Sequence, residues 1–208
     1  NADAYQSVQT AKNGVFSTRS EVMRLRDLQT PSLLLDEVRM KRNVGRLKTR
    51  LMTANVSFRP HLKTAKSIDV ARLLMETTGG PATVSTLAEA EHFAAEGVKD
   101  ILYAVGIAPN KLDRLLAIRR GGADVSIILD SVEQADVVAA KSREAGDPIP
   151  TLIEIDCDGH RAGVKPDSAE LLEIGKRLHV NGASLRGVLT HAGGSYDCRT
   201  IECIVQAA

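Results

Sequence analysis

The chain has no tryptophan, and aromatic residues make up only 3% of its 208 residues. Its core must therefore be built from Leu, Ile, Val and Ala, which the 43% hydrophobic content can supply. Long apolar runs are also lacking: ILYAVGIA at 101–108 is far shorter than the roughly 20 residues that a membrane-spanning helix needs. No charged segment followed by an apolar stretch opens the chain, as it would in a secretory signal. We therefore expect no membrane partner.

An excess of charge of one sign is lacking as well, because 27 Lys and Arg residues balance 26 Asp and Glu residues. The resulting net charge of +1 gives no electrostatic reason to expect a nucleic-acid partner. The three cysteines, Cys157, Cys198 and Cys203, show no CxxC spacing. They fit a reducing compartment better than a disulfide framework, so we expect a cytoplasmic protein.

Nucleotide-binding motifs are missing too, since no strand is followed by GxGxxG or by GxxxxGK[ST]. After a polar N-terminal extension at 1–29, β-leaning runs alternate with longer amphipathic runs. Strands are predicted at 31–36, 56–62, 82–86, 100–105, 124–130, 150–156 and 185–191. The alternation indicates an α/β fold with a parallel sheet, either open and doubly wound or part of a (β/α)₈ barrel.

Ligands of parallel α/β folds meet the carboxyl ends of the strands, and several chemically useful side chains fall there. A half-buried lysine near other cations becomes a usable amine that can bond to a carbonyl substrate or to pyridoxal phosphate. Arg59 and Arg161 supply fixed positive charge, and His191 can stack on a cofactor or act as a base near neutral pH. The other candidates are His61, Lys63, Lys66, Ser85, Thr86, Tyr103, Asp156, His160, Thr190, Ser195 and Tyr196.

Each candidate also has an ordinary interpretation. A lone lysine or arginine at a strand end is often a solvated rim residue, and His61 and His191 can be ordinary buried histidines. The segment DCDGH at 156–160 could suggest a metal site, but its members lie too close in sequence to converge easily. Gly193 and Gly194 fit a tight turn, with close approach of a phosphate as the alternative. Composition and spacing alone reach an α/β domain with a basic, histidine-bearing site.

Five ordered segments resemble one family. RPHLKTAKS at 59–67 is similar to the RPHxKTHK segment of the D-threonine aldolase and D-serine dehydratase family, fold-type III pyridoxal-phosphate enzymes related to alanine racemase. TPSLLLD, TVSTLAEAE, IEIDCDGHRAGV and GVLTHAGGSY occur in the family's order and at its approximate spacing. The resemblance covers about residues 29–204. It implies that 30–208 form a barrel of the alanine racemase N-terminal kind, with about six of eight strands present.

The resemblance implies that Lys63 holds pyridoxal phosphate covalently and that Lys66 is the secondary lysine of the motif. It also implies that Arg161 contacts the phenolic oxygen of the cofactor and that His191 lies against its pyridine ring. The remaining expected site residues are His61, for proton transfer beside His191, and the cofactor contacts Ser85, Tyr103 and Arg59.

Two positions depart from the family pattern, because Ala65 and Gly194 stand where histidine is often found. This departure changes the expected acid–base set. Family members also continue into a C-terminal β-domain that carries ligands for a divalent metal. We therefore expect the chain to be a fragment or a short form with no metal ligand of its own, and manganese or zinc only in the full-length members.

The implied activity is that of a pyridoxal-phosphate-dependent lyase acting on β-hydroxy-D-amino acids. Aldol cleavage to glycine and an aldehyde, as in D-threonine aldolase, is the preferred prediction. Dehydration of the D-serine dehydratase kind, to ammonia and an oxo acid, is the alternative. Racemisation, cofactor binding without catalysis, and an incomplete chain with no function of its own stay open. The expected partners are a small D-amino acid and, as in the family, a second copy of the chain.

Overall fold

The computed structural model describes residues 9–12, 15–18 and 21–207, so residues 1–8 of the predicted N-terminal extension lie outside the described residues. A small sheet of order β3-β2-β1-β4 opens the fold. It contains β1 (Gln9–Lys12), β2 (Val15–Thr18), β3 (Glu21–Arg24) and β4 (Leu34–Asp36), with the short 3-10 helix η2 (Leu25–Asp27) after β3. The β1–β4 pair is parallel and the other two pairs are antiparallel.

A second, five-stranded sheet forms the centre of the molecule, and its strands are all parallel. Its order, β5-β6-β7-β8-β9, follows the order of the chain. The strands are β5 (Ala82–Val84), β6 (Asp100–Gly106), β7 (Asp124–Leu129), β8 (Pro150–Ile155) and β9 (Ser184–Thr190). Each lies within or close to a segment that the sequence predicts as a strand.

Helices connect the strands and begin at the positions that the sequence favours. They are α1 (Glu37–Thr53), α2 (Ile68–Leu74), α3 (Leu87–Ala95), α4 (Leu112–Arg120), α5 (Val132–Ala145), α6 (Ala169–Val180) and α7 (Ile201–Gln206), with the 3-10 helices η3 (Pro109–Lys111) and η4 (Gly194–Asp197). All of the α-helices except α4 have a Ser, Thr or Asp N-cap whose side chain accepts a backbone N–H of the first turn. No helix among the described residues is long and apolar enough to cross a membrane.

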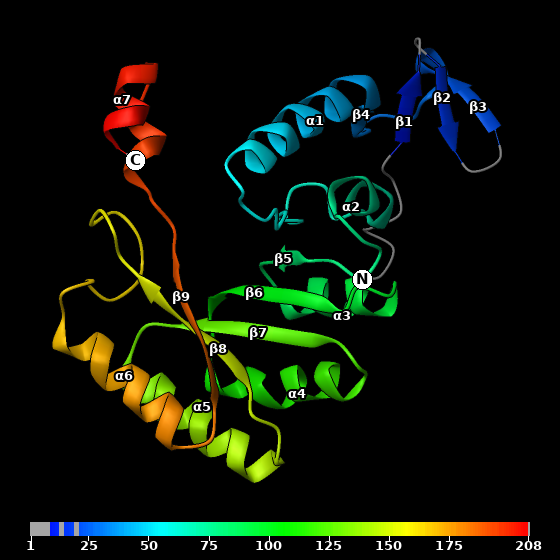
Figure 1. Cartoon of the computed structure of the whole chain (residues 1–208). Coiled ribbons are helices and arrows are strands. Elements are labelled where there is room, and N and C mark those ends of the chain that lie inside the picture. Colours follow the sequence, from blue (N-terminus) through cyan, green and yellow to red (C-terminus); the bar gives the residue numbers. More distant parts are fainter. Residues whose placement is uncertain (1–8, 13–14, 19–20, 208) are drawn as a thin grey trace.

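Helices α3 to α6 cover one face of the five-stranded sheet (Figure 1). A single hydrophobic core lies between them and the sheet, and it includes Phe93, Tyr103, Ile127 and Leu178, none of which has exposed surface. An open doubly wound sheet would carry helices on both faces and would reverse its strand order at a switch point. Consecutive strand order with helices on one face is instead the arrangement of a (β/α) barrel, which confirms the predicted α/β fold class.

The predicted strand at 56–62 is much shorter in the structure than the sequence suggests. Only His61 pairs with the sheet, through an isolated parallel bridge to Thr83 of β5. Thr83 N donates to Pro60 O at 2.8 Å, and Leu62 N donates to Thr83 O at 2.9 Å. Pro60 has no N–H to extend the ladder, so pairing stops there. The bridge nevertheless places His61 as a sixth strand position beside β5.

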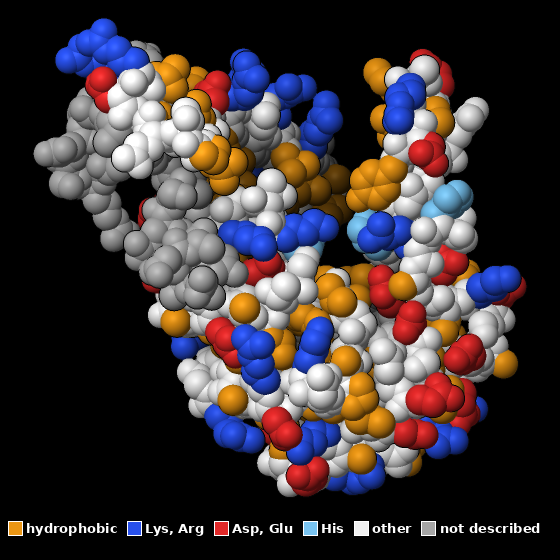
Figure 2. Space-filling model, turned by 180° about the vertical axis from the view of Figure 1, so that it is seen from behind, with side chains coloured by type: hydrophobic (Ala, Val, Ile, Leu, Met, Phe, Trp, Pro, Cys, Tyr) orange, Lys and Arg blue, Asp and Glu red, His pale blue; other side chains and the backbone are white. Residues whose placement is uncertain are grey.

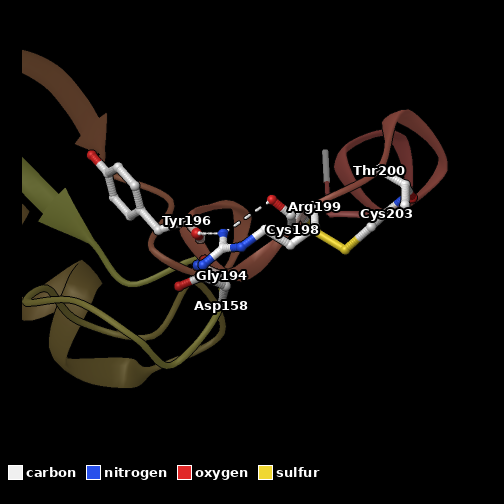
Figure 3. The surroundings of a disulfide bond; sticks show 7 residues. All are labelled: Asp158, Gly194, Tyr196, Cys198, Arg199, Thr200 and Cys203. Atoms are coloured by element: carbon white, nitrogen blue, oxygen red, sulfur yellow. Dashed lines mark hydrogen bonds between the residues drawn. A yellow bond between two sulfur atoms is a disulfide. The ribbon is translucent and has the colours of Figure 1, made fainter.

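A disulfide bond departs from the cysteine prediction. Cys198 and Cys203 are paired, with their Cα atoms 5.3 Å apart (Figure 3), and Cys157 is free and exposed. The pairing follows from the local fold, because Thr200 caps α7 by accepting the N–H of Cys203 and the first turn folds back toward Cys198. The lack of CxxC spacing predicts no disulfide framework, and the Cys198–Cys203 pair corrects that prediction. The cytoplasmic location stays a prediction.

Candidate functional site

The carboxyl ends of the parallel strands bring the predicted histidines and cations to one side of the sheet. Strand residues alternate between the two sheet faces. Val125, Ile127 and Leu129 of β7 point into the helix-covered core, and the alternate residues of each strand face the other way. Figure 2 shows this other side hollowed, with histidine and Lys or Arg side chains on both walls of the hollow.

His61 is held by two neighbours from the motif region. The backbone N–H of Lys63 donates to Nδ1 of His61 at 3.3 Å, and Oγ of Ser85 lies 3.3 Å from Nε2. Because Nδ1 accepts a hydrogen bond, the neutral ring carries its proton on Nε2 and donates it to Ser85. The structure thus brings together His61, Lys63 and Ser85, as the sequence predicts for the strand ends.

Lys66 and Lys63 differ in the partners of their side chains. Its ammonium group lies 3.1 Å from Oε1 of Glu89, a carboxylate that is almost completely buried. The second oxygen of Glu89 accepts the backbone N–H of Ser85 at 2.8 Å. Lys66 therefore neutralises a buried charge that positions the turn after β5, whereas the Lys63 side chain is exposed and enters no hydrogen bond or ion pair with another described residue.

A second group forms where the loops after β8 and β9 meet. Nη2 of Arg161 lies 3.4 Å from Nδ1 of His191, and Nε2 of His191 lies 3.0 Å from the hydroxyl of Tyr196. An arginine can only donate, so Nδ1 of His191 accepts and Nε2 carries the proton of the neutral ring. Both histidines thus have the same tautomer, assigned from their partners.

The two groups influence each other electrostatically. Burial is the largest cause that lowers the pKa of His61, and the Lys63 ammonium adds to it. Burial also lowers the pKa of His191, followed by the positive charges of Arg161 and Lys63. The Lys63 charge thus acts on both rings. Both imidazoles are consequently biased toward the neutral form, which can accept a proton.

Asp158 joins the two loops that carry Arg161 and His191. Its Oδ2 atom accepts the backbone N–H groups of Gly193 and Gly194, both at 2.7 Å. These bonds, with that of Gly194 first, lower the pKa of the Asp158 carboxyl. A side chain at Gly193 would collide with Arg161, because a Cβ atom there would lie 2.8 Å from Cγ of the arginine. The Gly193–Gly194 pair therefore allows close packing of the two loops.

Two of the predicted cofactor contacts lie elsewhere. The guanidinium of Arg59 forms a two-pronged pair with Asp100, at 2.8 and 2.9 Å, and also donates to Ala82 O. Asp100 and Ala82 are the first residues of β6 and β5, so Arg59 lies at the opposite end of the strands from Lys63. Arg59 lies there because it comes two residues before His61, the residue that pairs with β5.

Tyr103 is also placed away from the hollow. The residue has no exposed surface and belongs to the core between sheet and helices, on the other face of β6 from Leu102 and Ala104. Its hydroxyl meets Nζ of Lys111 at 2.8 Å, at the start of α4. The sequence itself indicates this placement, because Tyr103 is two residues after the core residue Ile101 and therefore lies on the same face of β6.

Three further carboxyl groups belong to the site and were not among the predicted site residues: Glu89, Asp158 and Glu154. A charge at an inward position of a strand is a usable signal for Glu154, which lies within β8. In the sequence, Asp158 stands out only as a member of the DCDGH segment at 156–160. Among the described residues there is no group of three His, Cys, Asp or Glu side chains that could hold a metal ion.

The arrangement can support amine chemistry at Lys63. An exposed lysine amine lies near two imidazoles biased toward neutrality, and Arg161 keeps most of its five donors free of partners among the described residues. Such a set can hold an anionic carbonyl compound and move a proton beside it.

Comparison with known proteins places the chain in a family. The family model of the alanine racemase N-terminal domain matches residues 35–202. D-threo-3-hydroxyaspartate dehydratase of Delftia sp. is 48% identical over 178 residues, which is 85% of this chain and 47% of that protein. 3-Hydroxy-D-aspartate aldolase of Paracoccus denitrificans is 34% identical over 153 residues, covering 72% of this chain and 39% of the relative.

A solved structure of similar sequence has the same fold. The alanine racemase-like protein of Idiomarina loihiensis superposes with a TM-score of 0.82 at 45% identity, over 86% of this chain and 48% of the other. The chain thus spans about half the length of the relatives it matches. With this match in sequence and fold, the chain belongs to the alanine racemase N-terminal domain family of fold-type III pyridoxal-phosphate enzymes.

Proposed function

We propose that this chain supplies the cofactor-anchoring half-barrel of a pyridoxal-phosphate-dependent lyase that acts on β-hydroxy-D-amino acids. The observation that carries the proposal is the convergence of Lys63, two histidines of lowered pKa and Arg161 at one side of the parallel sheet. These residues occupy the motif positions that the family resemblance singles out. The whole protein's reaction is proposed on the same basis, since the chain spans about half of its relatives' length.

The residues present fit pyridoxal phosphate. When bound, this cofactor supplies an electron sink for the α-carbon of an amino acid. Lys63 offers the exposed amine that anchors it, and Arg161 offers unused N–H donors for an anionic oxygen of its ring. The exposed edge of the His191 ring is fixed by Tyr196, which leaves the imidazole face available for stacking. We leave Arg59 and Tyr103 out of the proposed contacts because their polar groups are engaged elsewhere.

The same residues can handle protons beside Lys63. In the neutral tautomer, Nε2 of His61 donates to Ser85 and Nδ1 has only the weak, 3.3 Å contact with the Lys63 N–H. The positive charge of Lys63 disfavours protonation of both rings, so each histidine is a base at neutral pH. We propose His61 and His191 as the proton-transfer residues, and Ser85 as the group that holds the tautomer of His61.

We propose dehydration, to ammonia and an oxo acid, ahead of aldol cleavage. From the sequence, cleavage is narrowly preferred, but the identity of 48% to a hydroxyaspartate dehydratase exceeds the 34% to a hydroxyaspartate aldolase. Aldol cleavage stays the second candidate, because a relative at 34% identity is named for it. The products separate the two reactions: an oxo acid and ammonia support dehydration, whereas glycine and an aldehyde support cleavage.

The test of the proposed site is borohydride trapping. The purified chain is mixed with pyridoxal phosphate and reduced, and the phosphopyridoxyl group is located by peptide mass. Selective label on Lys63, absent in Lys63→Ala and kept in the control Lys176→Ala at an exposed position of α6, is the expected result. Label spread evenly over surface lysines in all three proteins would contradict the proposal.

A further inference from the structure

Glu89 is a buried carboxylate in the first turn of α3, and only 1% of its side chain is exposed. It follows the N-cap Thr86 at the spacing of a capping box, in which the glutamate bonds back to the backbone N–H of the capping residue itself. Here Oε2 of Glu89 accepts the N–H of Ser85 instead, one residue before the cap, at 2.8 Å. Capping of α3 alone therefore requires neither the burial of Glu89 nor this partner.

The other oxygen of Glu89 contacts the segment that carries Lys63. Oε1 lies 3.1 Å from Nζ of Lys66. Lys66 ends a turn that begins at Leu62, because its backbone N–H donates to Leu62 O at 3.0 Å. Leu62 N in turn donates to Thr83 O of β5 at 2.9 Å. The turn around Lys63 is therefore tied to the sheet at its start and to Glu89 at its end.

The backbone of Lys66 has a conformation that depends on such a tie. Its φ of 49° lies in the left-handed region, which residues other than glycine rarely adopt. A residue in that region is retained where the surrounding contacts determine its conformation. The hydrogen bond to Leu62 and the ion pair with Glu89 are contacts of this kind. Loss of the ion pair would therefore release the end of the turn.

The contact of Glu89 with Ser85 leads to the same turn from the other side. Oγ of Ser85 lies 3.3 Å from Nε2 of His61, and Nδ1 of His61 accepts the N–H of Lys63 at 3.3 Å. The contacts form a closed ring, in which one oxygen of Glu89 acts through Ser85 and the other through Lys66. Only a carboxylate has two oxygens that accept, since the amide of a glutamine would present a donor to one of these partners.

We propose that Glu89 is a positioning residue that fixes the turn carrying Lys63 against His61, so that the lysine amine and the imidazole keep one relative orientation. This inference deepens the proposed function and rests on it for the role of Lys63 as cofactor anchor. The fixing itself is a property of the cofactor-free chain, because every contact in the ring is made between the chain's own residues.

The first test follows the ring nitrogens of His61 by NMR in the cofactor-free chain, at a pH above the ordinary histidine pKa. The native ring should carry its proton on Nε2, because Nδ1 accepts the N–H of Lys63. In Glu89→Gln the turn is released and Nδ1 loses this donor, so the two nitrogen resonances should shift toward each other as both tautomers become populated. Glu91→Gln, which breaks an exposed ion pair with Arg114 on the same helix as Glu89, is the matched control and should leave the ring unchanged. An unchanged tautomer in Glu89→Gln would overturn the proposal.

Three further variants separate positioning from a merely structural role. Lys66→Met leaves the buried carboxylate without its cation, whereas the double variant, Glu89→Gln with Lys66→Met, removes both charges and so keeps the chain folded. All should give the same mixture of His61 tautomers as Glu89→Gln, because each opens the same ring of contacts. A larger change in the double variant would show that the two residues act independently. Ile174→Val lowers stability in the core beside α6, and the same mixture there would show that loss of stability alone is sufficient. Either result would overturn the proposal.

The closing test is the rate at which pyridoxal phosphate and borohydride label Lys63, relative to the exposed Lys176 of the same chain. We expect this relative rate to fall about fivefold in Glu89→Gln, the factor that corresponds to about 1 kcal/mol, and to stay unchanged in Glu91→Gln. Equal rates in Glu89→Gln and the native chain would contradict the positioning of the amine. A native chain that shows no preference for Lys63 would defeat the proposed function, and the tautomer of His61 would still decide the role of Glu89.

Discussion

Nη2 of Arg161 lies 3.4 Å from Nδ1 of His191, although the two residues are 30 positions apart in the chain. The contact exists because the loops after β8 and β9 converge and Asp158 fastens them at Gly193 and Gly194. It links a residue that can bind an anion to a residue that can move a proton. Two consecutive βα units thus complete one wall of the site by themselves.

Substitution of Arg161 by glutamine should raise the pKa of His191. Arg161 is the largest charge that lowers this pKa, second only to burial, so its removal takes away a repulsion against the imidazolium form. Titration of the histidine ring protons by NMR measures the change. His179, which lies near the end of α6, serves as the unaffected reference. An unchanged or lower pKa of His191 would show that the 3.4 Å contact does not persist in solution.

The free energy of unfolding should depend on pH through His61 and His191. Both pKa values are lowered in the folded chain, so the unfolded chain binds protons more readily as pH falls below about 6.5, the ordinary histidine value. Stability from these groups is therefore present above that pH and is lost as pH falls through the lowered values. Glu154, whose pKa is raised, acts in the opposite direction.

Because Glu154 opposes the histidines, the measurement compares the native chain with His191→Gln. Urea unfolding at a series of pH values between about 7 and 5 gives the difference in free energy between the two proteins. This difference should shift in favour of the variant as pH falls, since only the native chain has the depressed His191 to protonate. A difference that is constant with pH would mean that His191 has an ordinary pKa.

Substitution of Asp158 by alanine should loosen the loop at 191–197. The change removes the shared acceptor of two backbone N–H groups, those of Gly193 and Gly194. Their amide hydrogen exchange should become faster, while amides of β7 in the core keep their rates. Asp167→Ala, at an exposed position of the same loop after β8, is the matched control. Unaltered exchange at both glycines would rule out the fastening role.

Much of the fold can be predicted from residue periodicity, but the position of each side chain relative to the site cannot. Short β-leaning runs between longer amphipathic runs predict the places of β5 to β9, because strand and helix patterns are local properties of the sequence. Lys63, His61 and His191 follow strand ends of one parallel sheet, and their roles in the site stay predictions. The positions of Arg59 and Tyr103 differ from the prediction. Arg59 pairs with Asp100 and Tyr103 faces the core, and both placements depend on strand register. The Cys198–Cys203 pair likewise needed the three-dimensional turn at Thr200.

Arg119 should contribute more to stability than a similar arginine at the surface. Its guanidinium contacts Asp147 at 2.7 and 2.9 Å and Asp124 at 2.9 Å, with 13% of its side chain exposed. It thus joins α4 to the first residue of β7 and to the segment before β8. Lysine cannot make the two-pronged contact. We expect Arg119→Lys to lower the free energy of unfolding by about 1–2 kcal/mol, measured by urea denaturation.

Arg114→Lys is the matched control for that change. Arg114 also makes a two-pronged pair, with Glu91, and lies on the same helix, but 51% of its side chain is exposed. Solvent screens such a pair, so the substitution should change stability by less than about 0.5 kcal/mol. Both arginines lie on α4 and make a two-pronged pair, and Arg119 differs in its burial and its added contact with Asp124. If both variants lose the same free energy of unfolding, burial of the Arg119 ion pairs adds nothing to stability. The packing of α4 against β7 and β8 would then depend on the apolar core alone.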